Sequence, residues 1–445
     1  MHLLTFDLGS TLYKVALFDD GGRSIALERI SPPLVNNELA ADAFKKTLLS
    51  AVATLRKRVP EAWNDIAAIS FATQANSFLL LGGDDRPLTN IISWMDGRAA
   101  ELADDLKTIS DRPDFRGVTG MPRFTINLGM AKTMWLRKHE PELFQRAKRF
   151  CYISDFLTLW LTGLHRTEAG IAGLSGACNI QSLQWWKPGH PDVPENWLPK
   201  VERAGADLGM LLPDVADIFG LPRNCRFIVG SLDQYCGAVG TGTVNPGAVC
   251  ETTGTVLAAV RCSDHLETNL APDVYQGPAF DPGWFFQMSF SSTSANLLEE
   301  YRSSLKDHPT FQSLTRQAES APPGDPVIAS FDRDLSSFRN VQPHHTSGQV
   351  VRGIMRCVTQ ALAQQLGHLC GDQPPVEIRS AGGGARNDYW LQMKADTLQI
   401  PFVAMECEEP TSLGAAMLAA RAMGLGSLPE LSKRWCRPRA RFMPR

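Results

Sequence analysis

The chain has 445 residues, of which 44% are hydrophobic and 20% charged, as is typical of a globular protein with two or three domains. A formal net charge of −3 argues against a dedicated nucleic-acid-binding protein, and no apolar run is long enough to cross a membrane. The first seven residues lack a signal-peptide pattern, and none of the ten cysteines forms a C-x-x-C pair. These features favour reduced thiols and a cytoplasmic location.

The first 73 residues predict three strands, one helix and a further strand. Apolar runs predict the strands at residues 3–8, 15–18, 25–30 and 66–72. Between the last two strands, apolar residues recur at spacings of three and four, at Phe44, Leu48, Val52, Leu55 and Val59. That spacing places them on one helical face, and the element order is β-β-β-α-β.

The second half of the chain predicts a related arrangement. A strand beginning at residue 249 leads through a turn rich in threonine and glycine into a strand at 256–260. A long helix around 351–369, a strand at 376–380 and an alanine-rich helix around 412–423 follow. We therefore expect a weak internal duplication, with two domains of related fold at residues 1–240 and 241–445.

Two short turns are candidates for binding phosphate. In the first turn, Gly9, Ser10 and Thr11 follow Asp7, so backbone N–H groups and hydroxyls could approach phosphate oxygens and Asp7 could hold Mg²⁺. The second turn, Thr253–Gly254–Thr255, is its counterpart in the other half. An ordinary polar hairpin turn is the alternative for each one alone. Across a cleft, the two turns would grip a triphosphate from both sides.

Glycines at 382–384 form a further candidate site. They run from a strand end towards a helix, and Gly383 and Gly384 leave a surface free of side chains where a large planar group could lie. A tight connection between strand and helix is the alternative, in which Asn387 caps the helix.

Polar side chains suited to sugar hydroxyls and to acid–base chemistry follow other strands. Asp233 and Gln234 come after the apolar strand at 227–229, where Asp233 is either a helix N-cap or a general base. Gln74 and Asn76 follow the strand at 66–72, and Trp94, Asp96 and Arg98 lie about twenty residues further on. A structural ion pair between Asp96 and Arg98 is the alternative.

Several common catalytic motifs are missing. The sequence has no G-x-x-x-x-G-K-[ST] loop, no G-x-S-x-G elbow and no H-E-x-x-H helix. The glycine run at 382–384 is not the dinucleotide pattern G-x-G-x-x-G, so a Rossmann oxidoreductase is not expected.

Taken together and in order, these segments resemble the FGGY family of carbohydrate kinases, and the resemblance covers most of the chain. It rests on residues 6–11, 93–98, 155–163, 230–242, 251–255 and 381–387, with 414–416 downstream. The resemblance implies an α/β fold with two actin-like/hexokinase-like (ribonuclease H-like) ATPase domains flanking a central cleft. It also implies ATP-dependent phosphorylation of a sugar hydroxyl.

The resemblance carries roles to matching positions. Asp233 would be the catalytic base, and Asp7 and Asp233 would hold Mg²⁺. The sugar would contact Gln74, Asn76, Trp94, Asp96, Asp233 and Gln234. ATP would contact Gly9, Ser10, Thr11, Thr253, Gly254, Thr255, Gly383, Gly384 and Asn387.

Two departures from the family pattern affect the substrate assignment. Residues 326–340 lack a Gly-Glu-Arg segment common in the family, and Gln74 is followed neither by the Arg-Glu of glycerol kinases nor by the Met-His of xylulose kinases. The predicted pocket offers amides and carboxylates but no lysine, which favours a neutral ketose or polyol, with xylulose first. Ribulose, fuculose and glycerol-like substrates stay as alternatives.

Two alternatives of other classes are a catalytically silent sugar- or nucleotide-binding regulator on the same fold and a non-kinase actin-fold protein. Whether the chain forms a homodimer is left open.

Overall fold

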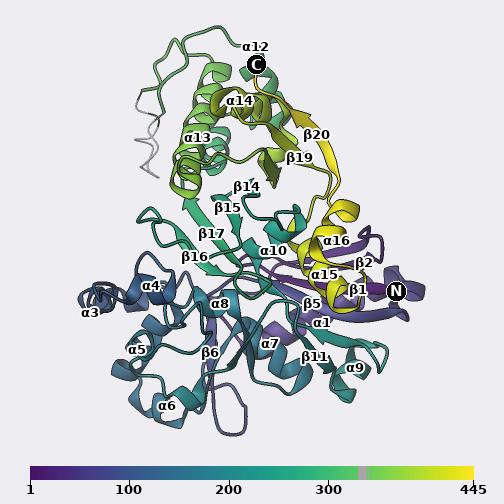
Figure 1. Ribbon diagram of the computed structural model, residues 1–445. Helices are drawn as coiled ribbons and strands as arrows, with labels where there is room; N and C mark the ends of the chain where they lie inside the picture. Colours follow the sequence, from purple (N-terminus) through teal and green to yellow (C-terminus); the bar gives the residue numbers. More distant parts are fainter. Residues whose placement is uncertain (329–337, 339) are drawn as a thin grey trace.

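The structure of the protein is a computed structural model that describes residues 1–328, 338 and 340–445. Two bodies are visible, each built around a β-sheet (Figure 1). The lower body is formed mainly by the N-terminal half, and the upper body contains α13 and α14 of the C-terminal half.

Within the described residues, the N-terminal sheet has the strand order β11-β12-β5-β1-β2-β3, and β13 also pairs with β5. β1 is antiparallel to β2 and parallel to β5, while β12 and β13 are parallel to β5. The bounds are β1 (His2–Leu8), β2 (Tyr13–Asp19), β3 (Ser24–Ile30), β5 (Ile66–Thr73), β11 (Asp207–Met210), β12 (Arg226–Ile228) and β13 (Ser231–Leu232).

The second sheet has the order β16-β17-β15-β14-β18-β19-β20 among the described residues. The bounds are β14 (Val249–Thr253), β15 (Leu257–Ser263), β16 (Tyr275–Pro278), β17 (Phe285–Ser291), β18 (Ile378–Ala381), β19 (Phe402–Met405) and β20 (Pro438–Phe442). The order β17-β15-β14-β18-β19 repeats β3-β2-β1-β5-β12 with the same strand directions. The predicted internal duplication is confirmed at the level of topology.

Besides its main sheet, the N-terminal half, which is described in full, contains helices and two small sheets, one of four strands and one of two. These helices are α1 (Ala41–Arg58), α2 (Pro60–Trp63), α3 (Ala103–Ser110), α4 (Phe115–Thr119), α5 (Gly129–His139), α6 (Pro141–Arg146), α7 (Ile153–Thr162), α8 (Ala169–Gly173), α9 (Pro213–Phe219) and α10 (Asp233–Gly240). The remaining strands are β4 (Glu38–Leu39), β6 (Phe78–Leu81), β7 (Ile91–Ile92), β8 (Arg149–Tyr152), β9 (Arg166–Glu168) and β10 (Lys200–Glu202).

Four of the five predicted apolar positions, Phe44, Leu48, Val52 and Leu55, are buried on α1, whereas Val59 follows the helix as its half-buried C-cap residue. The C-terminal half contributes α11 (Asn296–Ser304), α12 (Phe311–Ser320), α13 (Ser347–Cys370), α14 (Asp388–Leu398), α15 (Pro410–Ala422) and α16 (Leu428–Trp435). The long helix α13 begins with a capping box, in which Thr346 accepts from the backbone of Gln349 and the Gln349 side chain bonds back.

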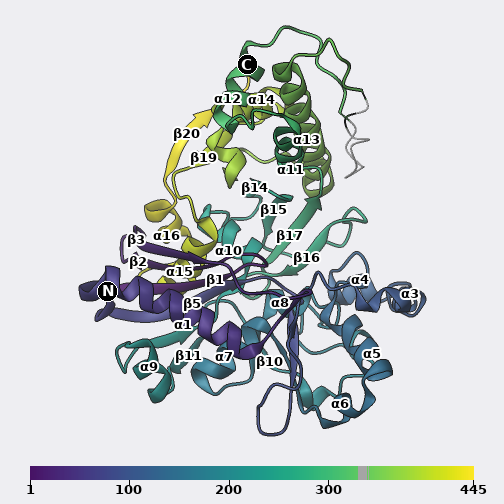
Figure 2. The ribbon, with the colours of Figure 1, turned by 180° about the vertical axis from the view of Figure 1, so that it is seen from behind.

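Helix α15 belongs to the C-terminal half of the sequence but packs on the N-terminal sheet. It contacts β1, β5 and α10, and its residues join the same apolar core as β1 and β5. Figures 1 and 2 show it beside these strands from opposite sides. At Gly414 a Cβ atom would lie 1.8 Å from the backbone oxygen of Cys236, so only glycine permits α10 and α15 to touch there.

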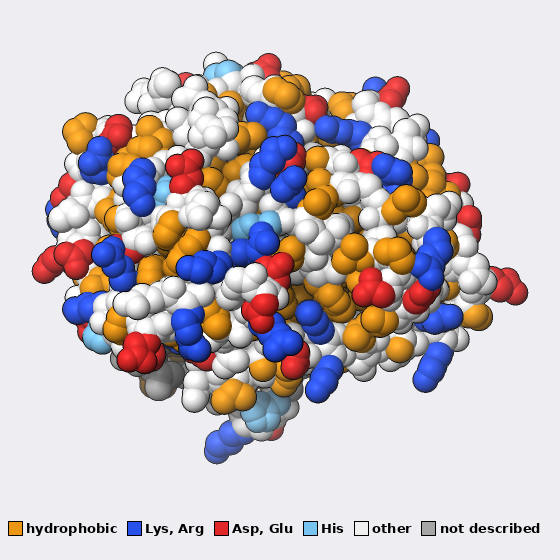
Figure 3. Space-filling view, turned by 90° about the horizontal axis from the view of Figure 1, so that it is seen from below, with side chains coloured by type: hydrophobic (Ala, Val, Ile, Leu, Met, Phe, Trp, Pro, Cys, Tyr) orange, Lys and Arg blue, Asp and Glu red, His pale blue; other side chains and the backbone are white. Residues whose placement is uncertain are grey.

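The surface carries charges of both signs, as expected from the nearly equal numbers of basic and acidic residues. Lys and Arg side chains are interspersed with Asp and Glu on the face in Figure 3. No described helix is both long and apolar enough to cross a membrane. All ten cysteines are unpaired, and nine are buried.

Candidate active site

The register of the N-terminal sheet brings three candidate segments to the same edge of the sheet. Asp7 on β1 lies opposite Ala72 on β5, and Ala72 lies opposite Ser231 on β13. All three strands are parallel, so the residues following them leave the sheet at the same edge. Through this edge pass the first turn (Gly9–Ser10–Thr11), Gln74 and Asp233.

Asp7 is buried and paired with a lysine. Its Oδ2 lies 3.1 Å from Nζ of Lys14, which occupies the facing position on β2. The same ammonium lies 2.7 Å from Oε2 of Glu409, immediately before α15. Burial raises the pKa of Asp7, and the positive charge of Lys14 opposes that rise. Lys14 therefore links the first strand pair to the C-terminal half.

Asp233 is the first residue of α10, and its Oδ1 accepts a hydrogen bond from the backbone N–H of Gln234 at 2.7 Å. The N-cap position is Leu232, so the alternative of an Asp233 N-cap is not what the structure has. Burial raises the pKa of Asp233 to about 7, and the nearby negative charge of Asp7 adds to the effect. A carboxylate with that pKa can take up a proton near neutral pH.

Ser10 connects the first turn to the predicted sugar-binding residues. Its hydroxyl donates to Oε1 of Gln74 at 2.8 Å and accepts from Nε1–H of Trp94 at 2.8 Å. Trp94 is 36% exposed, so part of the residue is accessible to a ligand. Three of the predicted residues are thus joined in one chain of hydrogen bonds.

Asp96 is held by Arg98, as in the structural alternative. Nε of Arg98 lies 2.7 Å from Oδ1 of Asp96, and the guanidinium also pairs with Glu38. Burial would raise the pKa of Asp96, but hydrogen bonds from Arg98 outweigh it, and the pKa lies below its ordinary value. The positive charge of Arg98 is consequently balanced within the protein.

Asn76 makes contacts with backbone groups on both sides of its amide. Its Nδ2 donates to the oxygen of Leu174 at 2.9 Å, and its Oδ1 accepts from the N–H of Gly129 at 3.2 Å. It adopts a left-handed backbone with φ of 64°. The predicted contact with sugar would therefore compete with contacts that hold α5 and the chain after α8.

The candidate nucleotide residues gather at the corresponding edge of the second sheet. Thr252 on β14 lies opposite Ala381 on β18, so Thr253 and Gly382 continue side by side. At Gly384 a Cβ atom would lie 2.7 Å from Cβ of Thr253, so the glycine run rests directly on the second turn. Thr255 at the end of this turn is exposed.

A cavity of about 710 Å³ opens beside the glycine run. Its lining includes Phe311, Thr315, Gly383, Gly384, Asn387 and Trp390. Asn387 caps α14 by accepting from the N–H of Trp390 at 3.0 Å, and its Nδ2 donates to Thr315 at 2.8 Å. The capping alternative is correct for Asn387, which still borders the cavity.

The two groups of residues are not joined by direct contacts. Among the described residues, no hydrogen bond or ion pair links the first turn or Asp233 with the second turn or the glycine run. The grip of both turns on one triphosphate stays a prediction.

Three lysines near these groups were missed in the sequence analysis. Lys14 could have been found from the hairpin register, which pairs it with Asp7. Lys132 is fully buried and donates to the backbone oxygens of Trp94 and Asn127, and burial lowers its pKa to about 7. Lys394 is fully buried on α14. A lysine at a buried helix position is almost always paired with an acidic group, and that is the signal that could have identified it.

Two carboxylates are available for a divalent cation. Oδ2 of Asp7 is bonded to Lys14, which leaves Oδ1, and Asp233 adds a second carboxylate close enough to interact with Asp7. No group of three or more acidic, histidine or cysteine side chains suited to a metal occurs in the part of the chain that is described. Such a sparse oxygen set fits Mg²⁺, which keeps several waters and takes phosphate oxygens as further ligands.

Comparisons with known proteins agree with this arrangement. A family model for the N-terminal domain of the FGGY family of carbohydrate kinases matches residues 2–240, and the model for the C-terminal domain matches 248–423. The xylulose kinase of Bacillus subtilis (strain 168) is 25% identical over 473 residues, covering 100% of this chain and 93% of the relative. The gluconokinase of the same strain is 23% identical over 453 residues, covering 95% and 88%.

The fold has a close match among solved structures. Ligand-bound xylulose kinase from Lactobacillus acidophilus superposes with a TM-score of 0.91 at 22% identity, covering 100% of this chain and 94% of that chain. The expected fold, with two α/β domains of the actin-like/ribonuclease H-like class, is confirmed. Most of residues 326–340, which lack the Gly-Glu-Arg segment, lie outside the described residues.

Proposed function

The chain belongs to the FGGY family of carbohydrate kinases and is therefore a phosphotransferase, and we propose that it transfers the γ-phosphate of ATP to a hydroxyl of a neutral ketose, with xylulose as the first candidate. One observation carries the proposal. Asp7, Gln74 and Asp233 stand at the ends of three parallel strands, and the pKa of Asp233 is raised to about 7.

In this proposal Asp233 is the general base. The sugar hydroxyl would lie against its carboxylate, which takes the proton as the oxygen attacks the γ-phosphate. Burial and the charge of Asp7 disfavour the ionised form of Asp233, so its pKa lies close to neutral pH. A base with this pKa is still largely ionised at pH 8.

Asp7 and Asp233 are the proposed ligands of Mg²⁺, which would neutralise charge on the phosphates. Lys14 places its positive charge against Oδ2 of Asp7, the carboxylate oxygen that the cation would not use. The first turn would present its N–H groups and Thr11 to phosphate oxygens, because the Ser10 hydroxyl already donates its one proton to Gln74. The second turn would present Gly254 and Thr255. The cavity beside Gly383, Gly384 and Asn387 would take the adenosine.

The charge of the sugar site supports a neutral substrate. Arg98 is bonded to Asp96 and Glu38, and Lys132 is fully buried against backbone oxygens. A sugar acid or sugar phosphate would need an uncommitted cation in contact with it. Gln74, Gln234 and Asp233 instead suit hydroxyls, and Trp94 would pack on the apolar face of the sugar.

The test is a coupled ADP-release assay over pentuloses, hexuloses, polyols and gluconate, with the Asp233→Asn variant as the control for sugar-dependent turnover. We expect the highest kcat/KM with xylulose. Best activity on another ketose or polyol would refute the pentulose choice alone. Activity only on gluconate would refute the charge argument, and this arm matters because a gluconokinase is nearly as similar to the chain as a xylulose kinase.

A further inference from the structure

A closed polar network lies beneath the second turn. Nζ of Lys394 is 2.8 Å from Oε1 of Glu251 and donates to Oγ1 of Thr253 at 2.7 Å. The Thr253 hydroxyl donates to Oε2 of Glu251 at 2.7 Å, and the Ser380 hydroxyl donates to Oε1. These side chains come from β14, β18 and α14, and each is fully buried.

The network occupies the hydroxyl of Thr253. A threonine hydroxyl has one proton to donate. That proton goes to Glu251, and an oxygen lone pair accepts from Lys394. The hydroxyl of Thr253 is therefore not free to donate to a phosphate, in contrast to its predicted role as a direct ligand. Phosphate contacts from this turn fall to Gly254 and the exposed Thr255, which follow immediately.

The same network is coupled to the candidate adenosine cavity. Nζ of Lys394 lies 5.1 Å from the ring centroid of Trp390, which lines that cavity. Gly384, also in the lining, rests on Cβ of Thr253. Lys394 thus contacts both the residue that begins the second turn and a wall of the cavity.

We propose that Lys394 is a positioning residue, which through Glu251 and Thr253 fixes the second turn against the glycine run in the orientation that binds the phosphates of ATP. The inference rests on the proposed function, because it takes these elements as the nucleotide site. Burying two charges is costly, and a buried pair adds little stability over apolar residues of similar size. Its hydrogen-bond geometry, in contrast, specifies where Thr253 sits.

The informative variant removes both charges. Lys394→Met alone leaves Glu251 buried without a cation and endangers folding, whereas Glu251→Gln combined with Lys394→Met leaves a neutral amide that can still bond Thr253 and Ser380. In the double variant we expect the KM for ATP to rise about tenfold, which corresponds to the loss of one well-placed hydrogen bond. The KM for sugar and the melting temperature should change little.

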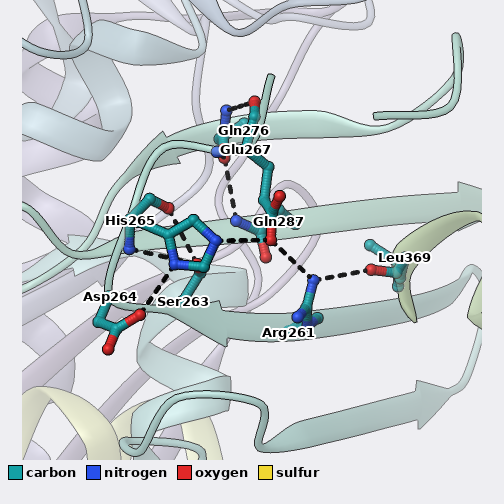
Figure 4. Close-up of polar contacts among 8 residues, drawn as sticks. All are labelled: Arg261, Ser263, Asp264, His265, Glu267, Gln276, Gln287 and Leu369. Atoms are coloured by element: carbon teal, nitrogen blue, oxygen red, sulfur yellow. Dashed lines mark hydrogen bonds and ion pairs between the residues drawn. The ribbon is translucent and has the colours of Figure 1, made fainter. Parts of the chain in front are cut away.

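Arg261→Met is the matched control. Arg261 lies on β15 of the same sheet and is also largely buried, with Nη1 3.3 Å from Oε1 of Glu267 and 3.2 Å from the oxygen of Leu369 (Figure 4). Its network contains His265, Gln276 and Gln287 but no residue of the second turn. This variant should keep the wild-type KM for ATP.

Steady-state kinetics and calorimetric titration with MgADP separate the outcomes. A folded double variant with wild-type KM for ATP and wild-type affinity for ADP would overturn the role of Lys394 and leave the proposed function intact. An equal rise in Arg261→Met would overturn it too, because the effect would then be a general loosening of the sheet. Wild-type protein that neither binds MgADP nor transfers phosphate would refute the function, and this inference with it.

Discussion

Replacing Asp233 with asparagine should abolish sugar-dependent ADP release and, at neutral and alkaline pH, stabilise the folded protein. Loss of a general base typically costs about 10²–10⁴ in rate. The gain in stability follows from burial, which raises the pKa of Asp233 from 3.8 to about 7. Asparagine keeps an oxygen that can accept from the N–H of Gln234 but carries no charge to bury.

The sign follows from proton linkage. Below pH 3.8 the carboxyl is protonated in both the folded and unfolded states, so its ionisation costs the wild type nothing. As pH rises from there towards about 7, the unfolded chain ionises first, and the free energy of unfolding of the wild type falls. Above pH 7 the deficit is constant. The advantage of Asp233→Asn should therefore grow between pH 4 and 7 and then level off.

The magnitude comes from the same two pKa values. Each tenfold change in an ionisation constant is worth about 1.4 kcal/mol, so the span from 3.8 to about 7 sets a ceiling of about 4 kcal/mol. The side chain retains some access to water, which lowers the expected gain to about 2 kcal/mol.

Urea unfolding at pH 4, 5, 6, 7 and 8 without Mg²⁺ measures this gain, with ADP release assayed on the same samples. Asp104→Asn, at an exposed position on α3, is the control for exchanging a carboxylate for an amide. If Asp233→Asn is less stable than wild type at pH 8, or if the difference in the free energy of unfolding does not vary with pH, the buried charge of Asp233 does not destabilise the folded protein. Retained turnover would remove Asp233 from the mechanism.

The activity of the wild-type enzyme should fall about tenfold for each pH step of one below about 7, because the proposed base must be ionised, and a flat kcat/KM profile from pH 5 to 8 would contradict this. Asp7→Asn should raise the Mg²⁺ concentration needed for half-maximal turnover while circular dichroism stays unchanged, and an unaltered Mg²⁺ dependence would exclude Asp7 as a ligand. Ser10→Ala should raise the KM for sugar, because the Ser10 hydroxyl joins Gln74 and Trp94 in one chain of hydrogen bonds, whereas an unchanged KM would mean that this contact does not orient the sugar site.

Local patterns in the sequence predicted several strands and helices of the fold but not the placement of α15. The apolar spacing around Phe44 matched α1, and the runs at residues 3–8 and 66–72 matched β1 and β5. Helix α15 is buried on nearly all sides, with residues 412–420 all buried. It has no single apolar stripe, so its sequence does not indicate which sheet it covers.

Likewise, the sequence predicted the short turns but not what their side chains bond to. Ser10 and Asp233 lie where the strand order places them, because a turn after a parallel strand leaves at a known edge. The partner of Thr253, Lys394, is 141 residues away in sequence. Such a contact depends on how α14 packs on the second sheet, which no local spacing encodes.

The crossing of α15 to the N-terminal sheet has a consequence for dissecting the molecule. A fragment ending at residue 240 would contain every strand of the first sheet and yet leave the apolar surfaces of β1 and β5 bare where α15 covers them. The complementary fragment would carry an alanine-rich helix with no surface to cover. Each fragment alone would therefore expose an apolar surface, and the two should be soluble only when they are produced together.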